Sequence, residues 1–256
     1  MNVNQSRLLS FLSKAARGEA EMSPHTLDRF AQYARDAMEK QFTPRDKAFT
    51  LRMSNIGKPS CQLQMQAKGV QPESPSYDFK MRMIMGDLME AAMFTLMEAA
   101  GIDIKSKHTK VSHQVGDTVI NGEYDVELDD GIWDIKTASP FAFEQKFNTP
   151  DGFNRIKDKD SFGYVAQLVG YAKAAKKKLG GWWVVNKANG DFKYVPASSI
   201  NEEEELAKIK ATVDTVNNDK FNRCFEPETE YFRGKPTGNT VLNSGCRFCS
   251  YRETCW

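Results

Sequence analysis

The chain has 256 residues, of which 40% are hydrophobic and 27% charged, so it can bury a substantial core in one or two domains. Its 35 basic and 34 acidic residues leave a net charge of +1, which lacks the positive excess of non-specific nucleic-acid binders but allows a local basic patch. No apolar run approaches the roughly 18–20 residues of a membrane span, and the polar sequence after residue 12 excludes a secretory signal. We therefore expect a cytoplasmic protein, in the host cytoplasm if the chain is viral, with no membrane partner.

The first part of the chain predicts helices. Two amphipathic patterns fill residues 1–45, and the second opens with Ser23 as the N-cap and Pro24 at the first helical position. Cys61 lies just before or inside a short helix. The strongest helical pattern of the chain follows at residues 77–100.

From residue 103 the sequence turns to alternating, β-branched stretches that predict strands up to residue 137. The segments that follow predict a loop at 145–160, a helix at 162–178, a hairpin turning at Asn189-Gly190, a charged helix at 201–219 and an irregular tail. Helices therefore flank a central mixed sheet, which predicts an α/β (or α+β) fold.

The stretch "GEYDVELDDGIWDIKTA", residues 122–138, carries the first candidate chemistry. Strand side chains alternate between faces, so one face carries the acidic residues and the lysine of both strands: Glu123, Asp125, Glu127, Asp134 and Lys136. A two-residue turn at Asp130-Gly131 would place Asp125 opposite Lys136. Carboxylates that hold Mg²⁺ beside a lysine suit metal-assisted phosphodiester hydrolysis. The same pattern also fits a solvated edge hairpin with cross-strand ion pairs.

The helix at 77–100 adds Gly86 and Glu90, which lie four residues apart on one face. A mid-helix glycine costs about 1 kcal/mol relative to alanine, so we expect Gly86 to serve a close approach. Methionines recur at four-residue intervals, which we interpret as core filling, at Met81, Met85, Met89, Met93 and Met97.

The helix at 162–178 carries Gln167 and Tyr171, again four residues apart on one face. Its basic end, which includes Lys173 and Lys177, either favours the helix dipole or meets phosphates.

The histidines and two of the tryptophans have simpler interpretations. We interpret His25, His108 and His113 as ordinary polar residues; of Trp182 and Trp183 we expect one in the core, with base stacking as the alternative.

The order "GDLME", "GEYDVEL", "WDIKT" and "QLVGY" resembles the PD-(D/E)xK nuclease superfamily, and its RecB-like branch in particular. The resemblance covers residues 86–171 and implies a restriction-endonuclease-like core. It implies that Glu90, Asp125 and Asp134 bind Mg²⁺ or Mn²⁺, with the Ile135 carbonyl as a further ligand. Lys136 would position or activate the attacking water. Many members have histidine at the Glu90 position, and Glu90 would complete the metal shell directly or through water. By the same resemblance, Gln167 and Tyr171 would contact DNA phosphate or support Lys136.

Three of the five cysteines fall in the last eleven residues, a pattern that favours a metal site over disulfides in a reducing compartment. Some RecB-like nucleases, including the AddB helicase–nuclease subunit and CRISPR-adaptation nucleases, have one cysteine before the core and three after it. Here that pattern is matched by Cys61, Cys246, Cys249 and Cys255. The resemblance implies a structural [4Fe–4S] cluster, with Zn²⁺ as the alternative at the four thiolates. Cys224 is left over, as a buried or free thiol.

The resemblance thus implies one nuclease domain over residues 1–256, divided into a helical region (1–75), a core (76–200) and a tail (201–256) that the cluster ties back to the first region. The implied activity is that of a metal-dependent DNA exonuclease acting on DNA ends, with single strands preferred, in recombination, end processing or DNA degradation, as in phage-encoded enzymes. The alternative is a non-catalytic DNA-end or partner-binding protein with the same fold and cluster.

Overall fold

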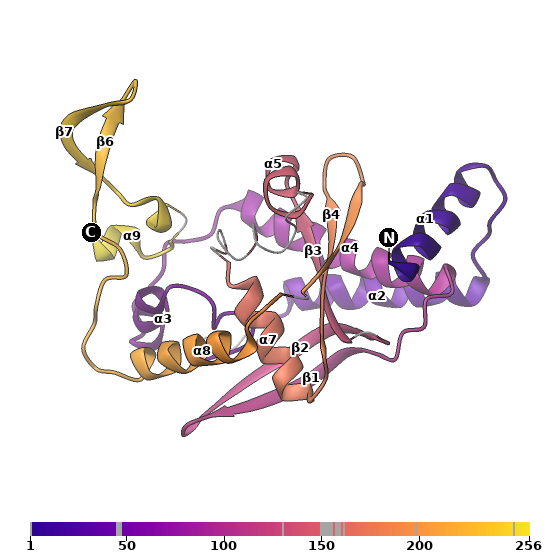
Figure 1. Ribbon diagram of the computed structural model, residues 1–256, viewed down its shortest axis with the longest axis horizontal. Helices are drawn as coiled ribbons and strands as arrows, with labels where there is room; N and C mark the ends of the chain where they lie inside the picture. The colour runs from indigo at the N-terminus through magenta and orange to yellow at the C-terminus, as the bar shows by residue number, and fades with distance from the viewer. Residues whose placement is uncertain are drawn as a thin grey trace.

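A mixed five-stranded sheet forms the centre of the computed structural model (Figure 1). The structure describes residues 2–44, 48–129, 131–148, 156, 160, 162–197, 199–247 and 249–256. The sheet has the order β1-β2-β3-β4-β5, and only β3 and β4 run parallel. Its strands are β1 (Ser106–Val115), β2 (Thr118–Leu128), β3 (Gly131–Ala138), β4 (Leu179–Asn186) and β5 (Phe192–Pro196).

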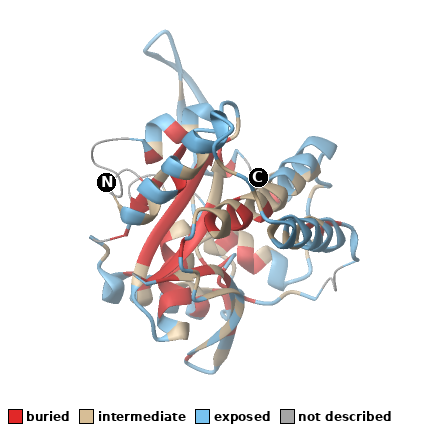
Figure 2. Ribbon diagram, turned by 90° about the vertical axis from the view of Figure 1, so that its right-hand side faces the viewer, coloured by how far each residue is buried: buried red, intermediate tan, exposed pale blue. Residues whose placement is uncertain are grey.

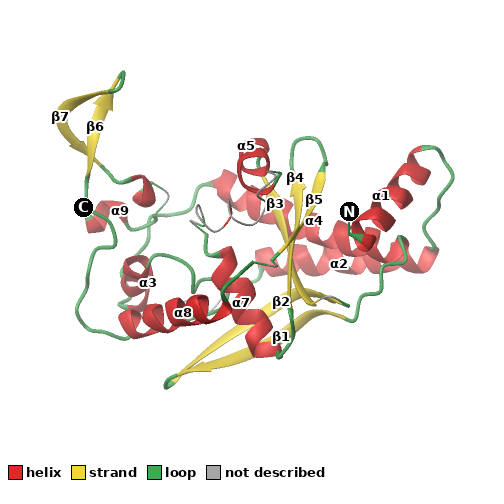
Figure 3. Cartoon of the chain, in the orientation of Figure 1, coloured by secondary structure: helices red, strands yellow, loops and turns green. Residues whose placement is uncertain are grey.

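Helices surround this sheet, as Figure 3 shows by colour. The longer ones are α1 (Val3–Ala16), α2 (Pro24–Phe42), α3 (Ser60–Ala67), α4 (Tyr77–Ala99), α7 (Tyr164–Ala175) and α8 (Glu202–Val216). The shorter ones are α5 (Pro140–Ala142), the π-helical turn η1 (Phe143–Phe147), the 3₁₀ turn η2 (Ser244–Cys246) and α9 (Arg252–Cys255). The expected start of α2 is confirmed, because the Ser23 hydroxyl accepts a hydrogen bond from the Thr26 amide and Pro24 is the first helical residue.

The central strands are buried on both faces, as expected for strands joined by a helical crossover. Trp182 and Val184 of β4 belong to the core that α7 and α8 cover. Trp183 and Val185 point the other way, into the core that α1 and α4 cover. Figure 2 shows this buried centre between exposed helices. Both tryptophans are fully buried, so neither can stack on a base.

Two sequence expectations about packing are wrong. The tail is not irregular, because β6 (Glu228–Phe232) and β7 (Lys235–Val241) form an exposed two-stranded hairpin. The regularly spaced methionines of α4 fill the core only in the second half of the helix, since Met93 and Met97 are buried but Met81 and Met85 are exposed by 51% and 46%. Much of the loop expected at 145–160, namely residues 149–155 and 157–159, lies outside the described residues.

The region around α3 contacts the tail directly. The Gln64 side chain, fully buried, donates to the Thr215 carbonyl at 2.7 Å, and the Glu73 amide donates to the Ser250 carbonyl at 2.7 Å. Arg252 forms an ion pair with Glu73 at 3.2 Å. These bonds join the beginning and the end of the chain through protein contacts alone.

Within the described part of the chain, no helix has the length and apolar character needed to cross a bilayer.

Candidate active site and cysteine centre

The candidate site begins where β2 and β3 separate. Their paired residues end at Val126 and Trp133, and the next main-chain donor, the Ile135 amide, bonds instead to the Asp125 carboxylate at 2.7 Å. The side chain of Asp125 thus takes the place of a backbone carbonyl. This bond holds the carboxylate against β3 at the point of separation.

The register of this hairpin differs from the sequence expectation by two residues. Leu128 pairs with Gly131, so Asp125 lies opposite Asp134 rather than Lys136, and the connection falls at 129–130, of which Asp130 is outside the described residues. Gly131 is needed in the strand itself: its φ is +132°, and a Cβ there would lie 2.4 Å from the Lys178 carbonyl oxygen. A shift of two preserves the faces, so the expected grouping of acidic residues and lysine survives.

Asp134 and Lys136 form the centre of the site. The Lys136 Nζ lies 2.5 Å from Asp134 Oδ2, and Asp134 is fully buried. Neither carboxylate oxygen of Asp134 accepts a well-aligned hydrogen bond from the described residues. A buried carboxylate with so few donors has lone pairs left for a cation.

The electrostatics of the site also indicate an excess of carboxylate charge that a cation could balance. Burial raises the pKa of Asp134 to about 8, partly opposed by Lys136, and raises the pKa of Asp125 to about 6, with a further increase from Glu90. Burial also opposes the charge of Lys136, but Asp134 and Asp125 outweigh it and raise the Lys136 pKa above its ordinary value. One ammonium therefore faces more carboxylate charge than it can balance.

Glu90 reaches this group from α4. Burial raises its pKa to about 7, against the opposing effects of Lys40 and Lys136. Lys40 of α2 itself pairs with Asp87 at 3.2 Å. The described residues do not support the expectation that Gly86 serves a close approach, because among them a Cβ there would meet only the Thr137 hydroxyl oxygen, at an ordinary 3.9 Å.

His108 is a site residue that the sequence did not reveal. Its Nδ1 lies 3.7 Å from Glu90 Oε1 and 3.5 Å from Glu123 Oε1. Its φ of +47° is a left-handed conformation within β1, and its ring meets Phe94 edge-on at 4.9 Å. Burial lowers the pKa of His108. The sequence around His108 does not indicate this position, because Glu90 of α4 and His108 of β1 come together only in the folded chain.

Of the two acidic neighbours on β2, only Glu123 approaches the site, through His108. Glu127 points elsewhere: it pairs with Lys177 at 2.8 Å and accepts a hydrogen bond from Ser106 at 3.0 Å. Lys177, which follows the end of α7, is therefore engaged within the protein.

Gln167 and Tyr171 bond to each other, Nε2 to the phenol oxygen at 2.9 Å. Tyr171 is buried, which raises its pKa, and Asp134 raises it further. Direct contact of Tyr171 with a DNA phosphate is therefore not available in this conformation. A supporting role beneath Asp134 and Lys136 fits its position.

The side chains of the candidate site are of the types that bind a divalent cation, but they are not already arranged around one. Hard oxygen donors from Asp125, Asp134 and Glu90 are the ligands that Mg²⁺ and Mn²⁺ prefer, and the buried oxygens of Asp134 have few donors. The described residues contain no group of three or more histidine, cysteine, aspartate or glutamate side chains already at metal-binding distances. The carboxylates would therefore have to close around the ion.

The structure also brings the cysteines together. Cys61, in the first turn of α3, interacts electrostatically with Cys249, which interacts in turn with Cys246 and Cys255. All five cysteines are free thiols. The thiols of Cys61, Cys246, Cys249 and Cys255 thus lie in one region, and sulfur ligands suit iron–sulfur or zinc binding, but these described cysteines are not already arranged as a metal-binding group.

Cys224 is exposed rather than buried, and it lies beside Cys61. Its sulfur accepts a hydrogen bond from the Cys61 amide at 3.0 Å, and a bond from the Cys61 thiol lowers the pKa of Cys224 to about 6. This fifth thiol is therefore a neighbour of the cysteine centre.

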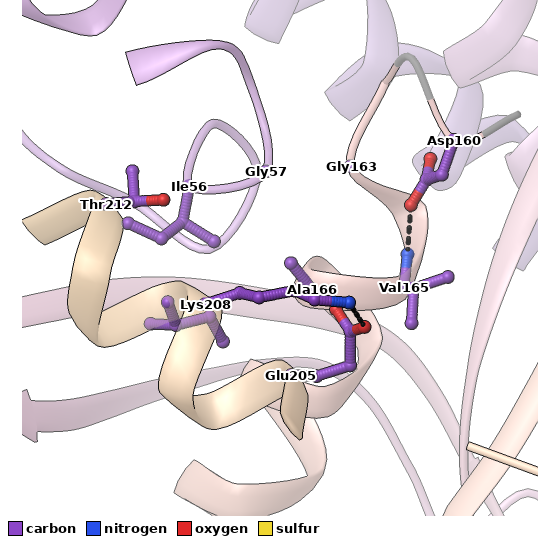
Figure 4. A pocket seen from close by; sticks show the side chains of 10 residues that line it. Ile56, Gly57, Asp160, Gly163, Val165, Ala166, Glu205, Lys208 and Thr212 are labelled. Atoms are coloured by element: carbon purple, nitrogen blue, oxygen red, sulfur yellow. Dashed lines mark hydrogen bonds and ion pairs between the residues drawn. The ribbon is translucent and has the colours of Figure 1, made fainter. Parts of the chain in front are cut away.

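A cavity of about 230 Å³ between α7, α8 and the loop before α3 contains none of the candidate catalytic residues. Figure 4 shows its polar features, the Asp160 carboxylate on the Val165 amide and the Glu205–Lys208 ion pair of 2.7 Å. The Asp160 carboxylate at its edge satisfies amides at the start of α7.

No protein-family model and no curated protein matches this sequence. Among solved structures, the chain is similar to the crystal structure of SSO0001, with 11% identity and a TM-score of 0.47, over 88% of this chain and 95% of that one. A likeness at this level carries no argument about activity. The candidate site therefore rests on its own residues, in a mixed α/β fold with a central five-stranded sheet flanked by helices.

Proposed function

We propose that the protein is a metal-dependent deoxyribonuclease with a PD-(D/E)xK-like core, acting as an exonuclease on DNA ends. One observation supports this above all: carboxylates from three different elements gather at Lys136, with Asp134 at 2.5 Å, Asp125 held against β3 by the Ile135 amide, and Glu90 within electrostatic range. An edge hairpin with cross-strand ion pairs would be solvated and would not bury Asp134. Buried carboxylates that lack sufficient counter-charge are costly, which favours a functional reason for their presence.

The proposed mechanism assigns a role to each side chain. Asp125 and Asp134 would hold Mg²⁺ or Mn²⁺, with Glu90 as a direct or water-mediated ligand and the Ile135 carbonyl as a further one. The ion, when bound, would polarise the phosphate and acidify a bound water. Lys136, charged at neutral pH because its pKa is raised, would orient that water and offset phosphate charge.

The other residues support this arrangement. The Ile135 amide fixes the orientation of Asp125, and His108 lies where it can steady Glu90. We also propose that Cys61, Cys246, Cys249 and Cys255 hold a structural [4Fe–4S] cluster or Zn²⁺. That group would reinforce the contacts between α3 and the tail, apart from the hydrolytic chemistry.

The test uses protein prepared without oxygen, single-stranded DNA labelled separately at each end, and Mg²⁺ or Mn²⁺. The wild type should release nucleotides, and Lys136→Ala and EDTA-treated samples should not. The label lost first gives the polarity of cleavage. If folded protein with intact cysteine centre cleaves neither end with either metal, the nuclease proposal fails and the non-catalytic DNA-binding alternative replaces it.

A further inference from the structure

Two stacked aromatic rings, with a lysine at each end, form a row that leads outward from Lys136. The Lys136 Nζ lies 5.5 Å from the centre of the Tyr164 ring, and Tyr164 stacks on Phe162 with 5.6 Å between centroids and 22° between planes. Lys146 of η1 completes the row, with its Nζ 5.5 Å from the Phe162 ring. The row therefore begins at the candidate catalytic lysine and ends at a second lysine.

The backbone holds these rings in place. Both carboxylate oxygens of Asp160 accept hydrogen bonds from the start of α7, from the Tyr164 and Val165 amides, each at 2.9 Å. Between the two rings, Gly163 has a φ of +74°, and a Cβ there would lie 2.3 Å from the Gly57 Cα. The turn that carries Phe162 and Tyr164 is thus fixed on two sides.

Phe162 remains 56% exposed, whereas Phe147, which contacts the other side of this group through Tyr164 at 6.4 Å between ring centroids, is almost fully buried. An exposed ring that is already stacked on Tyr164, with lysine ammonium groups nearby, is poorly suited to bind an apolar surface of another protein. It matches the combination by which proteins bind unpaired nucleic-acid strands: aromatic faces for the bases and cations for the phosphates. A base still paired in a duplex cannot offer its face in this way.

We propose that Phe162 is a stacking platform for an unpaired base of the DNA strand whose phosphate lies at Lys136, and that Lys146 meets a neighbouring phosphate. This inference rests on the proposed function and deepens it, because it names single-stranded DNA as the form that enters the site. Tyr164 acts as the positioning residue between Lys136 and Phe162. The preference for single strands then has a physical source within the turn that begins α7.

The test measures equilibrium binding of the full-length protein, with no added divalent ion, to a single-stranded oligonucleotide carrying one fluorescent 2-aminopurine. Phe162→Ala should weaken binding by about 5-fold to 100-fold and abolish the stacking-induced change in fluorescence. Phe162→Tyr should restore both. Replacing the stacked nucleotide by an abasic one should weaken wild-type binding to a similar extent and leave Phe162→Ala unaffected.

Phe232→Ala is a matched control, because Phe232 is 67% exposed and Arg233 lies 5.3 Å from its ring, but it belongs to the β6–β7 hairpin. It should bind like the wild type. Both substitutions remove exposed side chains, so both variants should keep the wild-type melting temperature.

The outcomes separate the two proposals. If the wild type cleaves DNA but Phe162→Ala binds and responds as Phe232→Ala does, the stacking platform is wrong and the nuclease stands. If binding depends on Phe162 but no metal supports cleavage, the nuclease is wrong and the platform stands. Absence of any binding to single-stranded DNA would overturn the platform.

Discussion

The Ile135 amide donates to the Asp125 carboxylate at 2.7 Å, and this bond replaces the next step of the β2–β3 ladder. A single side chain therefore both satisfies a strand donor and presents a carboxylate to the candidate metal site. Structural and chemical roles of Asp125 should be separable by substitution.

Asp125→Asn keeps an oxygen that can accept from Ile135, whereas Asp125→Ala leaves that amide without an acceptor. We expect Asp125→Ala to be less stable than Asp125→Asn by about 1–3 kcal/mol in urea unfolding, because an unsatisfied donor carries its full desolvation cost. Both variants should lose cleavage. Equal stability of the two would show that the bond contributes nothing.

Stability should also depend on pH in a defined direction. The folded protein raises the pKa of Asp125 to about 6, of Glu90 to about 7 and of Asp134 to about 8, so it binds these protons more tightly than the unfolded chain does. That stabilisation is complete below the unfolded pKa values of about 4 and is lost as pH rises through 6 to 8. The melting temperature without divalent ions should therefore fall over this range.

Added Mg²⁺ should reverse that fall, and more strongly at pH 8.5 than at pH 6, because the ion binds the ionised carboxylates. Asp134→Asn removes one of the three groups and should flatten the profile. A melting temperature that rises from pH 6 to pH 8.5 in the absence of metal would contradict the assignment of these charges.

Gly86→Ala should stabilise the protein by about 0.5–1 kcal/mol, since the residue lies inside α4 and, of the residues that the structure describes, the new methyl group meets the Thr137 hydroxyl oxygen alone, at 3.9 Å. Gly122→Ala is the contrasting control, because its Cβ would lie 2.5 Å from the Met53 Cγ. Thermal unfolding of both variants is the measurement. A less stable Gly86→Ala protein would show an essential role for this glycine, whereas a more stable protein with weaker cleavage would place substrate beside it.

The cysteine centre predicts a difference between two neighbouring thiols. Cys246→Ser should lose bound iron or zinc, any visible colour and several degrees of melting temperature, as loss of a structural metal ligand does. Cys224→Ser should retain the metal although Cys224 touches Cys61. Metal analysis and absorbance spectra of both proteins decide the matter. A Cys246→Ser protein with full metal content, or a metal-free Cys224→Ser protein, would revise the ligand set.

Much of the local structure was predictable because it depends on spacing. Alternation placed Asp125, Asp134 and Lys136 on one face, and capping residues placed the start of α2. The expected register of the β2–β3 hairpin was wrong because Asp-Gly is a strong turn signal. In the structure Gly131 lies in β3 instead, where it allows the tight contact with the Lys178 carbonyl, which is distant in sequence.

The remaining site residues were hidden for a similar reason. His108 approaches Glu90 only in the folded chain, and the proposed role of Phe162 depends on Tyr164 and Lys136, which lie beside it in the structure. A sequence read residue by residue records neither the left-handed backbone at His108 nor the stack at the start of α7. Likewise, the exposure of Met81 and Met85 depends on which face of α4 its neighbours cover, and residue spacing alone does not show this.

The crossover between β3 and β4 has a consequence for the order of folding. The short ladder between β2 and β3 has only three paired positions, and β3 gains its second neighbour only when β4, more than forty residues further along, docks in parallel. Contacts of such long range form late and slowly. A nascent or half-folded chain would thus carry the acidic residues and the lysine without assembling them, so the proposed site would form only once the sheet is complete.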